Sequence, residues 1–390
     1  MSLSRTETDS LLHRGFSRRD LGRIASLLTA GAALPFYNEF AMAQDAQQRM
    51  GRGAGGARRA MDPDAVRINS NENPLGPCKE GLEAIAKIAP YGGRYSPFND
   101  QGDMVTAIAE TEGVKESYVA AYAGSSDPLH RASCAFTSPT RSWVMADPGY
   151  GGGAPAFIGS TVTRVPLRAD LTHDAEAMIK ADPNGGVFYV CNPNNPSGTV
   201  TPRKDIEYLL ANKKKDSVVL IDEAYIHFSD TAQPSSDLVA ADKDIIVLRT
   251  FSKVYGMAGI RAGFALGRPD LLAKMRPYGV GFAPVPITSM ACATASLKVK
   301  DLVAKRKAIN KGVRENTFAF LEKKGVKYIP SETNFFMMEV GKTGPFTQAM
   351  AAQKVIIGRV WNAWPTMVRV TVGTQDEMDK FKAAYEKVTA

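Results

Sequence analysis

The sequence predicts an α/β fold in which a large, mostly parallel sheet is followed by a smaller α+β domain. The chain has 390 residues, more than one compact core usually holds. From Ala65 onward, short β-rich runs alternate with helical stretches, which is typical of a parallel sheet covered by helices. After about residue 290, a long helical stretch and two further strands indicate a second unit.

Seven runs in the first part predict the strands of the large sheet. Several are continuously apolar, as strands buried on both faces are. They span residues 118–123, 142–146, 161–166, 186–191, 217–221, 245–248 and 262–266. In the second part we expect a helix over 301–323, strands at 334–340 and 367–372, and a final helix from Gln375.

Residues 1–43 have the pattern of an export signal. Arg18-Arg19 precede an uncharged stretch from Ile24 to Asn38, and Ala41-Met42-Ala43 provides the small-residue ending of a cleavage site. The stretch is shorter than the ~20 apolar residues that a membrane span needs. It resembles a twin-arginine signal, so we expect a periplasmic protein without membrane association after cleavage. The alternative is an N-terminal amphipathic helix that packs on the body.

These patterns divide the chain into five segments. The second is rich in glycine and arginine and predicts a flexible leader. The five are a twin-arginine signal peptide at 1–43, the leader at 44–64, an N-terminal arm or small-domain segment at 65–95, the large domain at 96–290, and the small C-terminal domain at 291–390.

Charge and cysteine content exclude two classes of partner. The net charge is +8, but half of it lies in residues 1–60, so the remainder is only mildly basic and predicts no nucleic-acid partner. The four cysteines are far apart and have no histidine cluster nearby, so we expect no metal site. The four cysteines are Cys78, Cys134, Cys191 and Cys292.

Three strand ends carry residues that suggest carbonyl chemistry, because ligands bind beyond the carboxyl ends of parallel strands. Lys253 follows an apolar strand, and a desolvated lysine has a lowered pKa and attacks carbonyl groups. Asp222 ends a buried strand and needs a cation such as a protonated ring nitrogen. Tyr225 and Asn195 could donate hydrogen bonds to a phenolate oxygen.

A second group of residues predicts an anion site. A strand, Gly124 and a helical run follow one another, so backbone N–H groups and the helix dipole would face a negative group. Hydroxyls and a guanidinium suited to phosphate complete the site. Its residues are Ser125, Ser126, Thr250, Ser252 and Arg261.

Together, the lysine, the carboxylate, the phenolate donors and the anion site match pyridoxal 5′-phosphate (PLP). Tyr150 offers a flat face for stacking on the cofactor ring. Each residue alone is more often structural. However, Asn195, Asp222 and Lys253 each follow a strand at spacings of 27 and 31 residues, an arrangement that chance seldom produces.

Six motifs between residues 65 and 390 extend this pattern. They are Asn73-Pro74-x-Gly76-Pro77, Asn192-Pro193-Asn194-Asn195-Pro196-Ser197-Gly198, Asp222-Glu223-Ala224-Tyr225, Arg249-Thr250-Phe251-Ser252-Lys253, Ala258-Gly259-Ile260-Arg261-Ala262-Gly263 and Arg369-Val370-Thr371-Val372-Gly373-Thr374. Together they resemble the fold type I aminotransferases, specifically the histidinol-phosphate aminotransferase-like branch. The resemblance implies the PLP-dependent transferase fold (type I).

The resemblance implies a role for each cofactor residue. Lys253 would bind the cofactor aldehyde and later move a proton, and Asp222 would hold the pyridinium. Tyr225 and Asn195 would bind the ring oxygen, and Tyr150 would stack on the ring. The phosphate would be held by Ser125, Ser126, Thr250, Ser252 and Arg261.

It also implies substrate and subunit contacts. Arg369 would pair with the substrate α-carboxylate beside Asn195, and Arg359 would meet a distal anionic group. Asn73 would lie at the rim of the substrate pocket, and Tyr95 would reach the phosphate of a neighbouring subunit in a homodimer. Two departures affect the cofactor pocket or its rim: Asp127-Pro128 replaces a usual glutamate, and Gly151-Gly152-Gly153 follows Tyr150.

These features predict an exported, dimeric PLP enzyme that transfers an amino group between an L-amino acid and a 2-oxo acid. Two alternatives keep the cofactor. One is an oxygen-dependent amino-acid oxidase, as in the arginine oxidases that resemble this branch, or a decarboxylase; export favours it, because histidine biosynthesis belongs in the cytoplasm. The other is a non-catalytic PLP-binding protein, against which the intact set of Lys253, Asp222, Arg261 and Arg369 argues.

Overall fold

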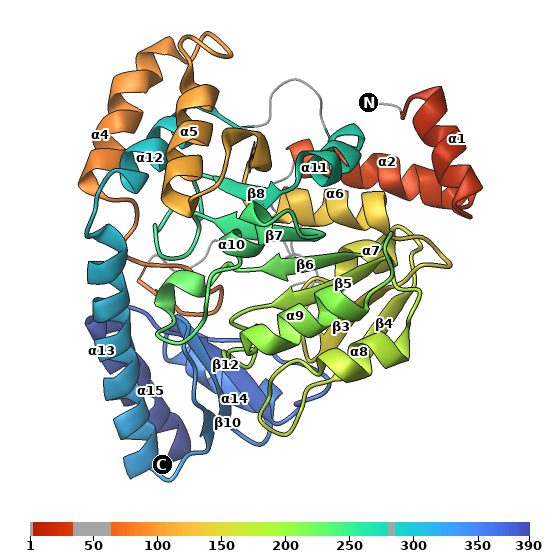
Figure 1. Ribbon diagram of the computed structural model, residues 1–390. Helices are drawn as coiled ribbons and strands as arrows, with labels where there is room; N and C mark the ends of the chain where they lie inside the picture. The colour runs from red at the N-terminus through yellow and green to blue at the C-terminus, as the bar shows by residue number, and fades with distance from the viewer. Residues whose placement is uncertain (1–2, 34–63, 280–284) are drawn as a thin grey trace, which may run out of the picture.

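The computed structural model describes residues 3–33, 64–279 and 285–390. The predicted cleavage site after Ala43 and almost all of the predicted leader lie outside these residues. A large α/β domain with a seven-stranded sheet is joined to a smaller domain by a long helix (Figure 1). This arrangement confirms the predicted fold class.

The large sheet contains all seven predicted strands. Its order is β2-β8-β7-β6-β5-β3-β4, and only β8 is antiparallel to its neighbours. β5, β6 and β7 form the fully buried centre, because their apolar residues face helices on both sides. The strands are β2 (Val119–Tyr122), β3 (Trp143–Asp147), β4 (Val162–Pro166), β5 (Val187–Cys191), β6 (Val218–Asp222), β7 (Ile245–Thr250) and β8 (Gly263–Gly267).

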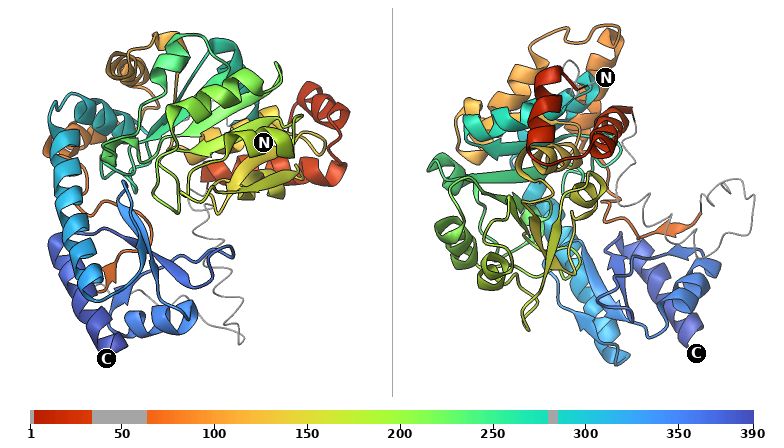
Figure 2. Two further views of the ribbon diagram at one scale, coloured as in Figure 1. Left: turned by 60° about the horizontal axis from the view of Figure 1, so that its bottom comes forward. Right: turned by 90° about the vertical axis from the view of Figure 1, so that its right-hand side faces the viewer.

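Helices that follow these strands along the chain complete the layers of the large domain (Figures 1 and 2). α8 and α9 pack against each other over β3 and β6, and α6 packs with α11 beside β8. The helices are α6 (Ser126–Phe136), α7 (Gly153–Phe157), α8 (Ala175–Ala181), α9 (Arg203–Asn212), α10 (Ser236–Ala240) and α11 (Pro269–Met275).

Three further helices pack together beside the β2 edge of the sheet. α12 (Ile287–Leu297) contacts both α4 (Lys79–Ile88) and α5 (Asp100–Glu112), and α5 contacts β2. Gly81 allows α4 to approach closely, because a Cβ at this position would lie 2.8 Å from the sulfur of Cys292. The domain boundary predicted at residue 290 therefore lies inside α12.

The small domain has its own core. β10 (Phe335–Glu339) is its central strand and pairs antiparallel with β12 (Met367–Thr371) and β9 (Tyr328–Ile329). β1 (Val66–Arg67) also belongs to the small domain, where it pairs in parallel with β11 (Val355–Ile356) in a separate two-stranded sheet. The helices are α13 (Leu302–Lys323), α14 (Thr343–Ala352) and α15 (Gln375–Thr389). Phe336, Met338, Val368, Val370 and Phe381 are among the residues that fill this second core.

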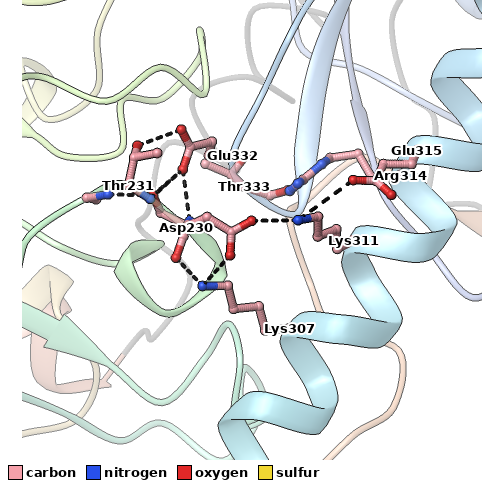
Figure 3. A network of polar contacts seen from close by, with 10 residues as sticks. Asp230, Thr231, Lys307, Lys311, Arg314, Glu315, Glu332 and Thr333 are labelled. Carbon is pink, nitrogen blue, oxygen red and sulfur yellow. Dashed lines mark hydrogen bonds and ion pairs between the residues drawn. The ribbon is translucent and has the colours of Figure 1, made fainter.

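A polar network joins the two domains beside α13 (Figure 3). The carboxylate of Asp230, from the large domain, pairs with Lys307 at 2.8 Å and Lys311 at 2.9 Å. These two lysines lower the pKa of Asp230 to about 2. From the small domain, Glu332 accepts hydrogen bonds from the backbone N–H of Asp230 at 2.9 Å and from Thr231 Oγ1 at 2.7 Å. The network fixes the small domain against the loop that follows β6.

The first described residues form two helices, α1 (Arg5–His13) and α2 (Arg18–Ala33), beside α6 (Figure 1). Leu11, Phe16 and Ile24 are buried in a small cluster that also contains Ile158 and Tyr278 of the large domain. This is the packing that the alternative interpretation of the N-terminus predicts, and export stays a prediction. None of the helices in the described ranges has the length and apolar character needed to cross a membrane.

Candidate active site

The site lies at the carboxyl ends of β5, β6 and β7, where the strand register brings the predicted residues together. Cys191 pairs with Asp222, and Asp222 with Leu248, so β5 and β6 end at the same level and β7 continues two residues further, to Thr250. The turns that follow carry Asn195 and Lys253. Within the described residues, no group of three or more His, Cys, Asp or Glu side chains could hold a metal ion.

Lys253 provides a nucleophile in the middle of this edge. Its Nζ donates a hydrogen bond of 3.0 Å to the carbonyl oxygen of Asn71 and lies 5.5 Å from the ring centroid of Tyr225. Burial and the nearby positive charge of Arg369 lower the pKa of Lys253 to about 8. A substantial fraction of the amine is therefore neutral near this pH and able to attack a carbonyl group.

Asp222 and Tyr225 lie beside Lys253 at the end of β6. Asp222 is 4% exposed, and its Oδ1 accepts a hydrogen bond of 3.1 Å from the backbone N–H of Ala224. The Tyr225 hydroxyl accepts a hydrogen bond of 3.0 Å from Asn71 Nδ2, and burial raises the pKa of Tyr225. A carboxylate and a phenol thus lie near the lysine, and their roles toward a cofactor ring stay predictions.

The predicted phosphate residues also come together. Thr250 Oγ1 and Ser252 Oγ are 2.9 Å apart, and Arg261 Nη1 lies 3.4 Å from Ser252 Oγ. Gly124 admits the arginine, because a Cβ at this position would lie 2.3 Å from Arg261 Nη2. A Cβ at Gly263 would lie 2.8 Å from the backbone nitrogen of Ser125, so β8 closely approaches the start of α6.

This cradle fits an anionic phosphate. Ser125 and Ser126 open the 11-residue helix α6, whose first N–H groups attract negative charge. Arg261 Nε is buried and has no hydrogen-bond partner among the described residues, which is costly unless a ligand supplies one. The donor set as a whole, with Lys253 and Asp222, fits PLP.

Arg369 reaches the site from β12 of the small domain. Its Nη1 donates to Asn195 Oδ1 at 2.9 Å and its Nη2 to the carbonyl oxygen of Asn69 at 3.1 Å. The guanidinium carbon is 5.5 Å from the ring centroid of Phe335 and 5.3 Å from that of Trp361. Two aromatic rings and two acceptors therefore hold the guanidinium in place.

The structure places four other predicted residues as follows. Tyr150 is partly buried and lies near enough to Arg261 to interact with it electrostatically, and its stacking on a cofactor ring stays a prediction. Tyr95 is 76% exposed, and its contact with a second subunit stays a prediction. Arg359 is half-buried and stacks on Trp361 at 5.4 Å. Asn73 Oδ1 accepts from the Leu75 N–H and its Nδ2 donates to the carbonyl of Val254, next to Lys253, and its place at the pocket rim stays a prediction.

The two departures from the family pattern have structural explanations. Asp127 forms two hydrogen bonds, of 2.7 and 2.9 Å, with Arg131 one turn further along α6, so its charge is compensated within the helix. A Cβ at Gly151 would lie 3.0 Å from Cζ of Tyr189, so this glycine makes room for a buried phenol. Gly152 likewise contacts Met145, whose sulfur would lie 2.6 Å from an added Cβ.

Sequence reasoning missed three residues that line the site: Asn71, Tyr189 and Trp361. Asn71 binds Lys253 through its carbonyl and Tyr225 through its side chain, and its positive φ of 53° is a conformation that asparagine tolerates. Asn73, two residues further on, stood out in the sequence as part of a motif, but Asn71 did not. Trp361 is one of only three tryptophans and follows Arg359 by two residues, which was the one available signal.

Comparisons with known proteins agree with this geometry. The family model for class I and II aminotransferases matches residues 63–384. An aromatic amino acid aminotransferase from Cutibacterium acnes is 33% identical over 329 residues, 81% of this chain and 90% of the relative. Histidinol-phosphate aminotransferase 1 from Nitrosococcus oceani is 32% identical over 333 residues, 83% of this chain and 89% of the relative.

Solved structures have the same fold. A structure from Erwinia carotovora atroseptica, provisionally assigned as a histidinol-phosphate aminotransferase, is 29% identical with a TM-score of 0.79 and covers 85% of this chain and 98% of that chain. The histidinol-phosphate aminotransferase of Sinorhizobium meliloti, solved with pyridoxal 5′-phosphate, has a TM-score of 0.75 at 24% identity and covers 89% and 94% of the two chains. The chain therefore belongs to the class I and II aminotransferases, a family of PLP-dependent enzymes.

Proposed function

We propose that this protein transfers an amino group between an L-amino acid and a 2-oxo acid in the periplasm, as a homodimer. The observation that carries the transfer reaction is the placement of a partly buried lysine near both an arginine of the phosphate cradle, Arg261, and the arginine of the small domain, Arg369. Arg369 is close enough to Lys253 to lower the pKa of the lysine. The group that would bind a substrate carboxylate therefore lies near the nucleophile.

Each residue of this chain has a distinct task in the proposal. Bound PLP supplies an electron sink for the bond-breaking step at the substrate α-carbon. Asp222 keeps the ring nitrogen protonated, and Tyr225 with Asn195 orients the ring oxygen. Lys253 Nζ would hold the cofactor aldehyde and would be the acid–base group that moves the proton. Arg261 with its neighbouring hydroxyls anchors the phosphate.

Arg369 and Trp361 define the substrate end. The guanidinium of Arg369 is held in a fixed orientation, which suits two-point binding of an α-carboxylate. Trp361 closes the pocket beside it and donates a hydrogen bond of 3.4 Å to the carbonyl oxygen of Gly149, next to Tyr150. The relatives' names provide two substrate classes to test against this indole wall, aromatic amino acids and histidinol phosphate.

The proposed location rests on the N-terminal sequence. Arg18 and Arg19 are both exposed at the start of α2, so the pair is accessible to an export receptor while Phe16 and Ile24 pack on the body. An exported wild-type chain is expected to have a mature N-terminus at Gln44, measured by intact mass. Replacing both arginines by lysine should keep the chain in the cytoplasm. A periplasmic chain of full length would contradict the proposed cleavage.

The proposed reaction is tested on the purified protein loaded with PLP. Borohydride reduction followed by peptide mass mapping should place the pyridoxyl group on Lys253, and Lys253→Ala should remove it. Amino acids supplied with a 2-oxo acid should yield the corresponding new amino acid, without oxygen uptake. Peroxide and ammonia formed without any 2-oxo acid would instead identify an oxidase, and carbon dioxide a decarboxylase. If no amino group were transferred to the cofactor even in a single turnover, the chain would be a non-catalytic PLP-binding protein.

A further inference from the structure

A buried tyrosine holds the carboxylate of Asp222. Tyr189 lies on β5, next to the strand that carries Asp222, and its hydroxyl donates a hydrogen bond of 3.0 Å to Asp222 Oδ2. The other oxygen of the carboxylate, Oδ1, accepts the backbone N–H of Ala224 at 3.1 Å. Each carboxylate oxygen therefore has a donor from this chain, and the donor to Oδ2 is the side chain of Tyr189.

Both partners of this hydrogen bond are removed from water. Tyr189 is 1% exposed and Asp222 is 4% exposed. A buried carboxylate remains ionised only where donors or a cation compensate for its lost hydration. Burial and the negative charge of Asp222 raise the pKa of Tyr189 well above its ordinary value, so the phenol keeps its proton. Tyr189 therefore acts only as a donor toward Asp222.

The position of the phenol is itself determined by packing. The ring centroid of Tyr189 lies 5.2 Å from that of Trp143 on the neighbouring strand. On another side, a Cβ at Gly151 would lie 3.0 Å from Tyr189 Cζ and 3.3 Å from its hydroxyl oxygen. Gly151 also has a φ of 92°, which favours glycine. The turn that begins the glycine run after Tyr150 thus leaves room for the phenol beside Asp222.

We propose that Tyr189 is a positioning residue for the cofactor, acting through Asp222. This inference rests on the proposed function, in which Asp222 meets the protonated ring nitrogen of PLP. A hydrogen bond to the ionised form of an acid favours that form, so Tyr189 biases the shared proton toward the ring nitrogen and away from Asp222. It also stops the carboxylate from turning out of its orientation.

The test replaces Tyr189 by phenylalanine, which keeps the ring and removes only the hydroxyl. Loss of one hydrogen bond to a charged group corresponds to about a tenfold effect. We expect the dissociation constant for PLP to rise about tenfold and kcat to fall about tenfold, while KM for the amino acid changes less than about twofold. The ratio of the visible absorption bands of bound PLP at fixed pH should also change.

Tyr118→Phe is the matched control. It removes a tyrosine hydroxyl that also donates to an aspartate, Asp242, but on the surface just before β2. Its PLP affinity, absorption spectrum and kcat should equal those of the wild type. A folded Tyr189→Phe protein with wild-type PLP affinity and spectrum would overturn the proposal.

A second variant covers the case in which Tyr189→Phe does not fold. Gly151→Ala keeps the hydroxyl but forces a Cβ against the phenol, so it should change PLP affinity and the absorption bands in the same direction. Wild-type values for this variant would then overturn the proposal. Because affinity and spectrum do not depend on turnover, a wild type that binds PLP on Lys253 but transfers no amino group would refute the proposed function while leaving this test intact.

Discussion

Replacing Arg369 by glutamine tests the substrate end of the site. The guanidinium is held by Asn195 and Asn69 at 2.9 and 3.1 Å and lies between the rings of Phe335 and Trp361, so little reorganisation is needed when a carboxylate binds. A hydrogen bond to a charged group contributes about 1.5–3 kcal/mol. We therefore expect kcat/KM for the amino acid to fall about ten- to a hundredfold.

The assay measures amino-group transfer to the PLP-loaded protein by the change in cofactor absorbance. PLP affinity should remain within about twofold of wild type, because the phosphate cradle is not altered. Arg369→Lys should give an intermediate value, since it keeps the charge but loses the two-point geometry. Arg203→Gln, which removes a surface ion pair with Asp237, should have no effect on transfer.

A second readout does not depend on turnover. The charge of Arg369 contributes to the lowered pKa of Lys253, so Arg369→Gln should move that pKa from about 8 toward its ordinary value of 10.5. In the cofactor-free protein, labelling of Lys253 by an amine reagent would then require a higher pH. Unchanged kcat/KM and an unchanged labelling profile in Arg369→Gln would refute the assignment of Arg369 to the substrate carboxylate.

Three further predictions concern other parts of the site and its support. In the cofactor-free protein, the unfolded chain binds the extra proton of Lys253 between about pH 8 and 10.5, so this group makes the free energy of unfolding rise with pH across that window, measured by denaturant titration. Gly124→Ala should displace Arg261, because the added Cβ would lie 2.3 Å from Nη2, and weaken PLP binding about tenfold or more by equilibrium dialysis. Arg249→Met leaves Glu223 buried without its 2.7 Å partner and should lower the free energy of unfolding by about 3–5 kcal/mol.

Each of these has a control and a contradicting result. In a Lys253→Met protein, the free energy of unfolding should no longer rise with pH across this window. An equal slope of the free energy of unfolding against pH in the variant and the wild type would contradict the lowered pKa of Lys253. Gly312→Ala adds a methyl group to α13 where nothing lies within 4 Å, so it should bind PLP as the wild type does. Arg268→Met removes partly exposed ion pairs and should cost less than about 1 kcal/mol. If Arg249→Met lowered the free energy of unfolding no more than Arg268→Met does, the buried pair of Arg249 and Glu223 would not be needed for stability.

The large sheet could be predicted because its strands are long enough to carry a pattern. β6 and β7 are continuous runs of buried residues bounded by polar ones, and such runs stand out in a sequence. β1, β9 and β11 were not predicted. Each has two residues, too few for any periodicity, and forms only because a neighbouring segment offers a backbone partner.

The site divides in the same way. Lys253, Asp222 and Arg261 could be identified because polar residues directly after apolar strands need a reason to be there, and the motifs around them are specific. Tyr189 could not be identified, because an aromatic residue inside a buried strand is indistinguishable by sequence from an ordinary core residue. Only its 3.0 Å contact with Asp222 reveals a polar role.

The sequence by itself determined the alternation of strands and helices, the cofactor residues at the strand ends and the family. Those features depend on local periodicity and on short motifs, which need no knowledge of distant parts of the chain. Tertiary structure alone decided which residues meet: Asn71 reaches Lys253 across 182 positions, and Arg369 reaches Asn195 across 174. Such contacts depend on how two separately packed domains face each other, and no local pattern in the chain encodes that.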